Sequence, residues 1–410
     1  MNSTSKTIGD FAKVVSGFAF KSRDFVDSGI PVVKIANIQH EHVIFDSAQY
    51  LPTEFMNISE RFHVREGDVM ISLTGSHLSQ PNSVVGRVAR YRHKFTALLN
   101  QRAARIQVVA PEKLDQAFLY YFLRQPNVTR ELTANAGGAA NQANISPRDV
   151  ERIELPPIDV RKQQSIADIL SAYDDLIENN RRRIKLLEAA ARQLYCEWFM
   201  RLRFPGHEHT KIVDGVPEGW CPGTVGDLGT IITGKTPSTK EADNFGNEVP
   251  FIKTPDMHEQ SIILYADEML SEKGAQSQVG KFLPEGAILV ACIGAGIGAV
   301  SMTGIAAQTN QQINSVVPRQ KDLLYYAYFA LRDLKPRLAA IGGGATMPNV
   351  NKSKFSNLPI AIPKGQILRE FHSSSAPMFE QMKTLHRQNH QLGGARDLLL
   401  PRLMDGRIAA

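Results

Sequence analysis

An internal duplication is the feature that most constrains how this chain folds. "EGDVMISLTG" from Glu66 recurs as "EGAILVACIG" from Glu285, and "LNQRAARIQVV" from Leu99 recurs as "TNQQINSVV" from Thr309. Five such pairs keep the same order along the chain, and the members of each pair lie about 206 to 219 residues apart. A repeat of this length indicates a duplicated domain, because solenoid repeats have periods of about 20 to 50 residues.

Each copy predicts the same order of elements. Short Val- and Ile-rich segments separated by Gly, Pro and Asn are typical of strands and turns. A helix is expected next, at 111–125 and at 321–333, and then a polar glycine loop and a long helix. The expected fold class is α+β: two duplicated mixed α/β domains separated by two long antiparallel coiled-coil helices, with pseudo-two-fold symmetry. The expected boundaries are 1–158 and 204–363 for the domains and 159–203 and 364–410 for the helices.

Both long helices carry a heptad seam, which is typical of a coiled coil. In the first helix, the seam positions are reached by alternate steps of four and three residues, and Asn180 is the one polar side chain among them. Its seam positions are Ile166, Leu170, Tyr173, Ile177, Asn180, Ile184, Leu187, Ala191, Leu194 and Trp198. The second seam is weaker but also has a central asparagine, Asn389. Its positions are Phe371, Ser375, Met378, Met382, Leu385, Asn389, Leu392, Arg396, Leu399 and Leu403.

An antiparallel arrangement with Asn180 against Asn389 aligns the two seams and places Trp198 opposite Phe371. A buried asparagine pair lowers stability but fixes the register, because any slip leaves an amide among leucines. The seam is about 48 Å long at about 1.5 Å per residue. That is somewhat more than one turn of duplex DNA, about 34–36 Å.

The second helix leaves an alternative open. Arg396 would face Tyr173, an arrangement that allows a cation–π contact. Pro377, Gly393 and Gly394 count against an unbroken helix, at about 1 kcal/mol for each glycine. In the alternative, two amphipathic helices pack separately, each on its own domain.

The distribution of charge suggests a polyanionic partner. The net charge is +6 and the pI about 9.1. No acidic residue lies between 69 and 111, and only two lie between 286 and 369. The basic residues there are Arg87, Arg90, Arg92, Lys94, Arg102 and Arg105, and then Arg319, Lys321, Arg332, Lys335, Arg337, Lys352, Lys354, Lys364 and Arg369. Two such stretches predict two surfaces for a polyanion, and the alternative is a solvated basic face.

Signals for catalysis are weak. Gly294, Gly296 and Gly298 form a GxGxG after an expected strand, but the repeat copy lacks them, which favours a hairpin of variable length. The three cysteines lie far apart and form no metal-binding pair. No apolar run reaches the 18 or so residues of a membrane span, and no signal peptide is recognisable. A cytoplasmic protein with no metal and no membrane partner is expected.

Several segments resemble the specificity (S) subunits of type I restriction–modification systems. Residues 155–199, "LPPIDVRKQQ…YCEWF", resemble the central conserved helix of that family, and "GARDLLLPRLMDGRI" from Gly394 resembles its conserved C-terminal end. "EGDVMISLTG", "LNQRAA" and "GGGATMPNVNKSKFSNLPI" resemble recurring pieces of its two target-recognition domains. The resemblance covers essentially the whole chain.

The resemblance implies a non-catalytic DNA-recognition subunit. Each globular domain would read one half of a bipartite site in double-stranded DNA, and the helices would act as a ruler between the halves. The helices would also dock two S-adenosylmethionine-dependent methyltransferase subunits, which a restriction subunit joins. No cofactor is expected on this chain, and S-adenosylmethionine is expected in the methyltransferase partner.

Candidate DNA contacts are polar residues at matching places in the two copies. Asn and Gln pair well with adenine, Arg and Lys with guanine, and Asp accepts from cytosine. The candidates are Lys34, Asn37, Asn100, Gln101, Arg102, Lys253, Asp256, Asn310, Gln311 and Gln312. Candidates for phosphate contacts in glycine loops are Asn141, Asn144, Asn349, Asn351 and Lys352. Positions that differ between the copies, Ser76 and His77 against Ala295, are favoured as base readers.

Other interpretations remain open at this point. The Asn–Gln pairs persist in both copies, so they could equally satisfy backbone groups inside the fold. For the whole chain, the alternatives are a stand-alone S-adenosylmethionine-dependent DNA methyltransferase that uses the 294–298 loop, and a coiled-coil adaptor that binds no nucleic acid.

Overall fold

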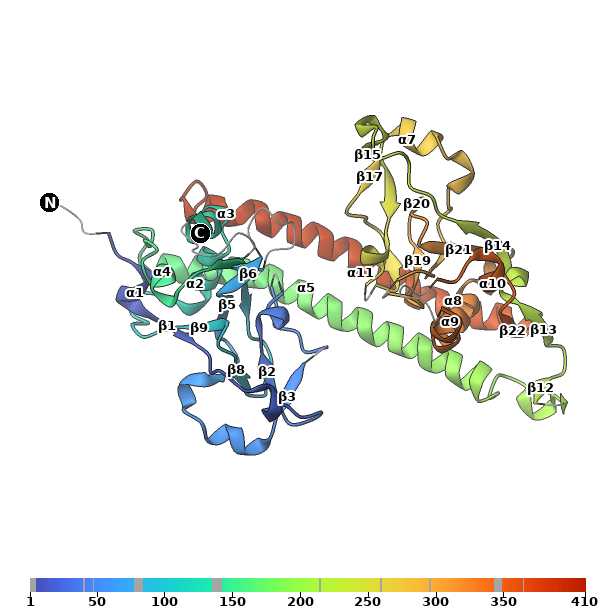
Figure 1. Cartoon of the computed structure of the whole chain (residues 1–410), viewed down its shortest axis with the longest axis horizontal. Helices are drawn as coiled ribbons and strands as arrows, with labels where there is room; N and C mark the ends of the chain where they lie inside the picture. The colour runs from blue at the N-terminus through green and yellow to red at the C-terminus, as the bar shows by residue number, and fades with distance from the viewer. Residues whose placement is uncertain are drawn as a thin grey trace. The chain divides into compact units, whose positions relative to one another are not determined.

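The chain forms two compact units (Figure 1). The structure, a computed structural model, describes residues 5–410 except 40, 47, 77–83, 135–141, 214, 259, 295, 343–348 and 364, and it leaves out the side chain of Gln142. The first unit comprises residues 1–176 and 392–410, and the second comprises residues 177–391. The long helices α5 (Val160–Tyr195) and α11 (Gln366–Met404) contribute to both units.

The first unit is built on two four-stranded sheets. Their strand orders are β1-β9-β5-β7 and β3-β2-β8-β4, and β6 pairs with β10. The strands are β1 (Ala12–Ser16), β2 (Ile30–Val33), β3 (Gln49–Leu51), β4 (His63–Val64), β5 (Val69–Ser72), β6 (Thr74–Ser76), β7 (Val88–Arg90), β8 (Ala97–Leu99), β9 (Ala103–Val108) and β10 (Gln142–Asn144). All four residues of β5 are buried, which agrees with its three consecutive apolar residues, Val69 to Ile71.

Helices cover the first sheet of this unit. They are α1 (Ile8–Phe11), α2 (Gln116–Leu123), α3 (Pro126–Ala134) and α4 (Pro147–Glu151), followed by the start of α5. The helix expected over 111–125 begins only at Gln116, because the Asp115 side chain caps it by accepting from the Phe118 N–H at 2.8 Å. Asp159 likewise accepts from the first N–H groups of α5, both at 3.1 Å.

The second unit repeats this topology. Its main sheets have the orders β14-β21-β18-β19-β16 and β17-β15-β20, and β13 pairs with β22 and β11 with β12. The strands are β11 (Ile212–Val213), β12 (Val216–Pro217), β13 (Cys221–Thr224), β14 (Gly229–Thr233), β15 (Phe245–Ile252), β16 (Ile262–Ile263), β17 (Met269–Leu270), β18 (Ile288–Ala291), β19 (Val300–Thr303), β20 (Gln308–Thr309), β21 (Ile313–Pro318) and β22 (Pro359–Ile362). The helices are α6 (Val225–Leu228), α7 (Glu272–Gln276), α8 (Leu324–Asp333), α9 (Lys335–Gly342) and α10 (Lys352–Ser356).

Short turns of helix complete the two units. A π-helical turn, Cys196–Met200, follows α5. The 3-10 helices are Ser22–Asp24, Ile35–Asn37, Thr53–Asn57, Glu60–Phe62, His207–His209, Ala242–Asn244, Thr254–Met257, Val279–Lys281 and Lys321–Leu323.

The strand pairing confirms the duplication. The order β1-β9-β5-β7 of the first unit recurs as β14-β21-β18-β19 in the second, and β3-β2-β8 recurs as β17-β15-β20. Besides β16 with β19, which is parallel in the second unit, the matching sheets β3-β2-β8-β4 and β17-β15-β20 each contain one parallel pair: β2 with β8, and β15 with β20. Such a pair joins segments far apart in sequence, so its recurrence reflects a common ancestor fold and not local propensity.

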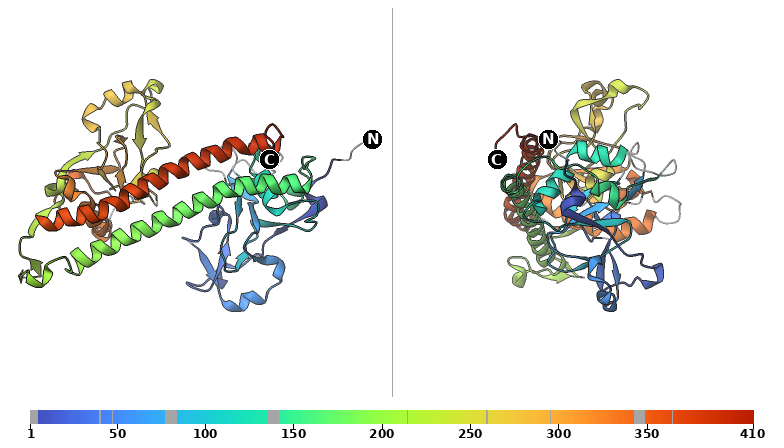
Figure 2. Two further views of the ribbon diagram at one scale, coloured as in Figure 1. Left: turned by 180° about the vertical axis from the view of Figure 1, so that it is seen from behind. Right: turned by 90° about the vertical axis from the view of Figure 1, so that its left-hand side faces the viewer.

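The two long helices pair antiparallel within each unit, as the seams predict (Figure 2). In the second unit, Asn180 Nδ2 donates to Asn389 Oδ1 at 3.0 Å. Further along, the rings of Trp198 and Phe371 lie 5.8 Å apart. In the first unit, Ile166 packs in the same core as Leu403.

The structure decides two points about α11 that the sequence left open. The helix is unbroken across Pro377, Gly393 and Gly394. Its apolar face is buried along much of its length, and such burial outweighs the low propensity of single residues. Arg396 forms ion pairs with Asp174 and Glu41 and not a cation–π contact with Tyr173. A buried guanidinium is stabilised more by carboxylates than by an aromatic ring.

Candidate nucleic-acid interface

A polar turn after β8 and β20 occupies the same place in both units. In the first unit it is Asn100-Gln101-Arg102, and the Leu73 N–H donates to the Arg102 carbonyl at 2.9 Å. In the second unit the Cys292 N–H makes the equivalent bond to the Gln312 carbonyl at 2.8 Å. The backbone therefore holds both turns against the segment that follows β5 or β18.

Within each turn, the first residue is structural and the next is exposed. Asn310 is buried; its Nδ2 donates to Gln312 Oε1 at 3.1 Å, and its Oδ1 accepts from the Gln312 N–H at 3.2 Å. Gln311 is exposed, and its Oε1 accepts from the Thr236 hydroxyl at 2.7 Å. Asn310 thus shapes the turn, and Gln311 lies at the surface.

The first unit exposes two side chains at this turn. Asn100 is half-buried and its N–H donates to the Val33 carbonyl at 3.0 Å, whereas Gln101 and Arg102 are both exposed. An exposed guanidinium and an exposed amide are the groups that pair most specifically with base edges in a major groove. Because Arg102 stands where the second unit has Gln312, the two turns present different chemistry on the same backbone.

Two other predicted pairs are occupied inside the fold. Asn37 is buried; its Oδ1 accepts from the Lys34 N–H at 2.9 Å and its Nδ2 donates to the Ile44 carbonyl at 2.9 Å. Asp256 accepts from the Lys253 N–H at 2.6 Å in the matching capping box. These two side chains shape their loops and have little capacity left for a base.

The ammonium groups of these pairs also have partners. Lys34 contacts Gln49, lies 4.1 Å from the centre of the Phe25 ring, and has its pKa lowered by burial. Lys253 forms an ion pair with Glu268. The prediction that these lysines contact DNA remains, but the geometry gives each of them an internal role.

The glycine-loop candidates are placed differently from the expectation. Asn144 lies on β10 and pairs with Thr74 of β6, where Ser76 is the last residue. Asn351 caps α10 by accepting from the Lys354 N–H at 2.9 Å, and is therefore not part of an open loop. Asn349 and Lys352 are exposed. His77, Asn141 and Ala295 lie outside the described residues.

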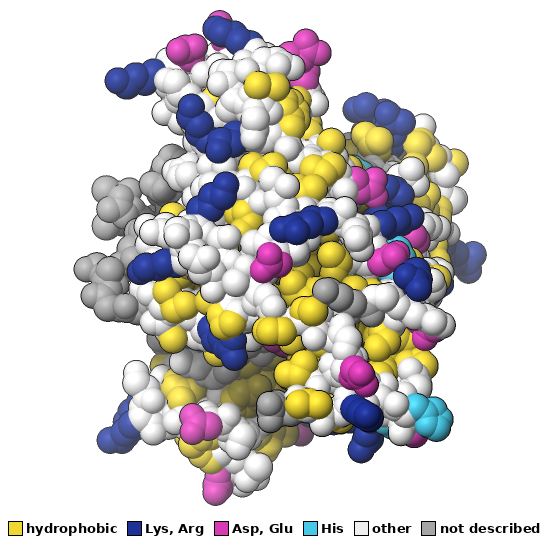
Figure 3. Space-filling model, turned by 90° about the vertical axis from the view of Figure 1, so that its right-hand side faces the viewer, with side chains coloured by type: hydrophobic (Ala, Val, Ile, Leu, Met, Phe, Trp, Pro, Cys, Tyr) yellow, Lys and Arg dark blue, Asp and Glu magenta, His cyan; other side chains and the backbone are white. Residues whose placement is uncertain are grey.

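The basic stretches are partly neutralised by distant acids. Arg105 is buried and pairs with Asp68 at 3.4 Å, and Arg332 pairs with Glu188 at 2.5 Å. The face drawn in Figure 3 carries Lys and Arg side chains singly, with Asp and Glu side chains among them. The acid-poor stretches therefore overstate the free positive charge of the surface.

The geometry does not favour a cofactor loop at 292–299. This segment joins the antiparallel strands β18 and β19. A dinucleotide or cofactor loop needs a helix after the strand, so that its N-terminus faces the phosphates. Burial raises the pKa of the Cys292 thiol to about 11, which makes it a poor nucleophile at neutral pH.

Two other kinds of site are absent from the residues that the structure describes. No group of three or more His, Cys, Asp or Glu side chains is arranged to hold a metal ion there. Within the same part of the chain, none of the helices has the length and apolar character needed to cross a membrane.

The duplicated fold and its exposed turns agree with a comparison to known families. A family model described as the type I restriction modification DNA specificity domain matches residues 2–189 and again residues 217–371. The chain belongs to this specificity family. The two matches fall on the two copies of the repeat, so the family domain is present twice.

Individual relatives match to different extents. The specificity subunit of the type I restriction enzyme HindI of Haemophilus influenzae is 42% identical over 199 residues, which are 47% of this chain and 42% of that protein. The MjaIX specificity subunit of Methanocaldococcus jannaschii is 24% identical over 414 residues, which are 98% of this chain and 93% of that protein. The chain thus spans less than half of the HindI subunit but nearly all of the MjaIX subunit.

A solved structure supports the fold. The S subunit of the type I restriction–modification system of M. genitalium aligns over 98% of this chain and 97% of its own, with a TM-score of 0.56 and 17% identity. At this identity the match supports the architecture alone. The expected fold class, two duplicated α/β domains with a pair of long helices, is confirmed.

Proposed function

We propose that this chain is the DNA-recognition subunit of a type I restriction–modification complex and that each unit reads one half of a bipartite double-stranded target. The observation that carries the proposal is the repetition of one specificity domain with different exposed side chains on an equivalent turn. A protein that reads two unlike half-sites needs this combination of one scaffold and two reading chemistries.

The turns supply the reading groups. Arg102 has the fork geometry that suits guanine, and Gln101 and Gln311 have amides that suit adenine. Lys94, Lys352 and Lys354 are exposed and suited to phosphate contacts, which position a protein without reading sequence.

The helix pair is proposed as the spacer and as the docking site for two methyltransferase subunits, which a restriction subunit joins. Its support is the seam itself, with its asparagine pair in the second unit. S-adenosylmethionine would bind to the methyltransferase partner, and this chain would contribute no catalytic group.

Two substitutions test the assignment in the assembled methyltransferase complex. Arg102→Ala should relax discrimination at one base of the first half-site by about 10- to 100-fold, because a bidentate pair contributes about 1–3 kcal/mol. Gln311→Ala should act on the second half-site alone. Lys113→Ala removes an exposed positive charge of the first unit away from the turn and serves as the control.

The alternatives predict different outcomes. Methyl transfer from labelled S-adenosylmethionine to DNA by the purified chain alone would contradict a non-catalytic role. Affinity that stays flat between 50 and 200 mM salt would favour a protein adaptor, because phosphate contacts weaken steeply with salt.

A further inference from the structure

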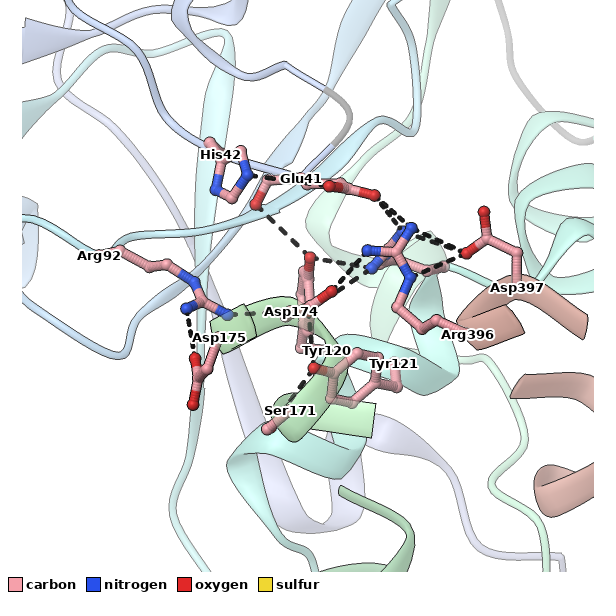
Figure 4. A network of polar contacts seen from close by, with 11 residues as sticks. Glu41, His42, Arg92, Tyr120, Tyr121, Ser171, Asp174, Asp175, Arg396 and Asp397 are labelled. Atoms are coloured by element: carbon pink, nitrogen blue, oxygen red, sulfur yellow. Dashed lines mark hydrogen bonds and ion pairs between the residues drawn. The ribbon is translucent and has the colours of Figure 1, made fainter. Parts of the chain in front are cut away.

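A buried cluster of charges joins four segments of the first unit (Figure 4). At its centre is Arg396 of α11, which is 3% exposed. Its guanidinium contacts Asp174 Oδ1 of α5 at 2.5 Å and pairs with the carboxylate of Glu41, which lies in the loop between β2 and β3. One side chain therefore connects both long helices to a loop of the globular domain.

Further residues complete the cluster. Arg124, the residue that follows α2, pairs with Glu41 at 3.1 Å, and the Tyr121 hydroxyl donates to Asp174 Oδ2 at 2.7 Å. Burial alone would lower the pKa of the Arg396 guanidinium, but the hydrogen bonds and charges of Glu41 and Asp174 outweigh it and raise the pKa. Arg396 is thus a permanent cation that contacts three carboxylates, those of Glu41, Asp174 and the neighbouring Asp397.

The second unit packs the matching junction without these charges. Arg396 is the eighth seam position of α11 and corresponds to Ala191, the eighth seam position of α5. The same offset matches Asp174 of α5 with Phe379 of α11. Tyr121 corresponds to Phe329, whose ring lies 6.0 Å from that of Phe379. The Arg–Tyr pair of the short helix is kept, since Arg332 donates to the Tyr328 hydroxyl at 3.1 Å, as Arg124 does to Tyr120.

The second unit has no carboxylate at the position of Glu41. Glu41 corresponds to Gln260, which lines an open pocket of about 410 Å³ beside Arg332 and Glu188. Because the equivalent seam positions there are Ala191 and Phe379, the Asp174–Arg396 pair of the first unit is not a requirement of this fold, although Arg332 still pairs with Glu188 of α5. Buried ion pairs often contribute specificity of arrangement and little net stability.

Hydrogen bonds and strand pairing connect the cluster to the turn Asn100-Gln101-Arg102. Asn37 Nδ2 donates to the Ile44 carbonyl and closes the loop that carries Glu41. This loop follows β2, which pairs in parallel with β8, and the Asn100 N–H donates to the Val33 carbonyl at 3.0 Å. A shift of the loop against the helices would therefore move the sheet that carries Gln101 and Arg102.

We propose that Arg396 is a positioning residue for base reading by the first unit. It holds the Glu41 loop, and with it the Asn100 turn, at a fixed orientation to the helix pair without touching DNA. This inference rests on the proposed function. It predicts that loss of the Arg396–Glu41 link weakens discrimination at the first half-site even where the fold is fully stable.

The test separates positioning from stability. The triple variant Tyr121→Phe/Asp174→Phe/Arg396→Ala copies the apolar junction of the second unit. Glu41→Gln removes the charge through which the loop pairs with Arg396 and Arg124, and it leaves the Asp174–Arg396 pair in place. Each is assembled with its methyltransferase partner, and its affinity is measured for the target and for single-base variants of each half-site. Thermal melting of each variant is recorded in parallel.

The expected result is a loss of discrimination of about tenfold at the first half-site in both variants, comparable to the contribution of one base pair. The second half-site should be read normally. Glu285→Gln is the control, because it removes a loop-to-α11 ion pair in the second unit, where Glu285 contacts Lys383 at 2.7 Å. This control should leave the first half-site unaffected.

Two results would overturn the proposal. One is full discrimination at the first half-site by Glu41→Gln. The other is a loss of discrimination by the triple variant that goes with a lower melting temperature and disappears whenever the stability of that variant is restored. A wild-type complex that binds no DNA sequence selectively would instead contradict the proposed function itself, so the two failures are distinguishable.

Discussion

The asparagine pair of the helix seam should reduce stability while fixing alignment. Asn180 is 7% exposed and Asn389 is half-buried, and they share one hydrogen bond of 3.0 Å. Replacing both by leucine gains about 2 kcal/mol at the buried position and about 1 kcal/mol at the half-buried one. It loses about 1 kcal/mol from the hydrogen bond. The double variant should therefore be more stable than the wild type by about 2 kcal/mol.

The single variants provide the control for this estimate. Asn180→Leu leaves the Asn389 amide without its partner, at a cost of about 1–3 kcal/mol that offsets the gain from the leucine. Asn180→Leu should therefore lie within about 1 kcal/mol of the wild type, and Asn389→Leu should be up to about 2 kcal/mol less stable because its leucine gains only about 1 kcal/mol. The double-mutant cycle should show clear coupling.

Tryptophan fluorescence reports the relevant transition. The chain has two tryptophans, Trp198 and Trp220, and both belong to the second unit, as does the asparagine pair. Urea unfolding followed by this signal measures the unit in question. A double variant less stable than the wild type would refute the reasoning that the pair sacrifices stability for register. An unchanged preference for spacer length in that variant would argue against the register role.

Three further changes have defined outcomes. Insertion of seven residues into both α5 and α11 adds about 10 Å of helix. It should lengthen the preferred DNA spacer by up to about three base pairs, as measured by binding to DNA targets with a series of spacer lengths. An unchanged preference would count against the role of the helices as a ruler. Burial lowers the pKa of His386 despite the charge of Glu188, so the unfolded state binds more protons than the folded state. The second unit should therefore have its full stability above about pH 6.5, and its stability should fall as the pH drops below that value. His386→Phe should flatten this decline in tryptophan-monitored unfolding, and an unaltered pH profile would show that His386 does not cause it. Arg105→Ala should destabilise the first unit by about 3 kcal/mol because it leaves Asp68 buried without its cation, as measured by amide hydrogen exchange in β5 and β9; exchange rates like those of the wild type would contradict this.

The sequence predicts features that depend on periodicity. The duplication, the strand-rich domains and the two seams follow from patterns of fixed spacing, and the contacts of Asn180 with Asn389 and of Trp198 with Phe371 agree with them. The continuity of α11 was not predictable from propensity, because the burial that holds Pro377 and Gly393 in a helix comes from the whole tertiary structure.

Roles within the candidate site were harder to predict, and for two different reasons. The capping roles of Asn37 and Asp256 had a local signal, a polar side chain three residues after the first residue of the turn, which a search for capping boxes would have found. The partners of Arg396 had no such signal, since Glu41 and Asp174 are distant in sequence and no periodicity connects them.

The contrast between the two junctions suggests why one of them is charged. Two α5 segments paired antiparallel would place Ala191, and not Arg396, beside Asp174, which would leave that buried carboxylate with only its longer ion pairs to Arg92 and Arg124, at 3.7 and 3.9 Å. Two α11 segments would bury Arg396 against Phe379. Both arrangements are unfavourable, because a buried charge loses its partner across the seam. An entirely apolar seam would tolerate both wrong pairings, whereas one charged junction in a duplicated chain is enough to make α5 pair with α11 and to give the two ends of the helix pair different identities.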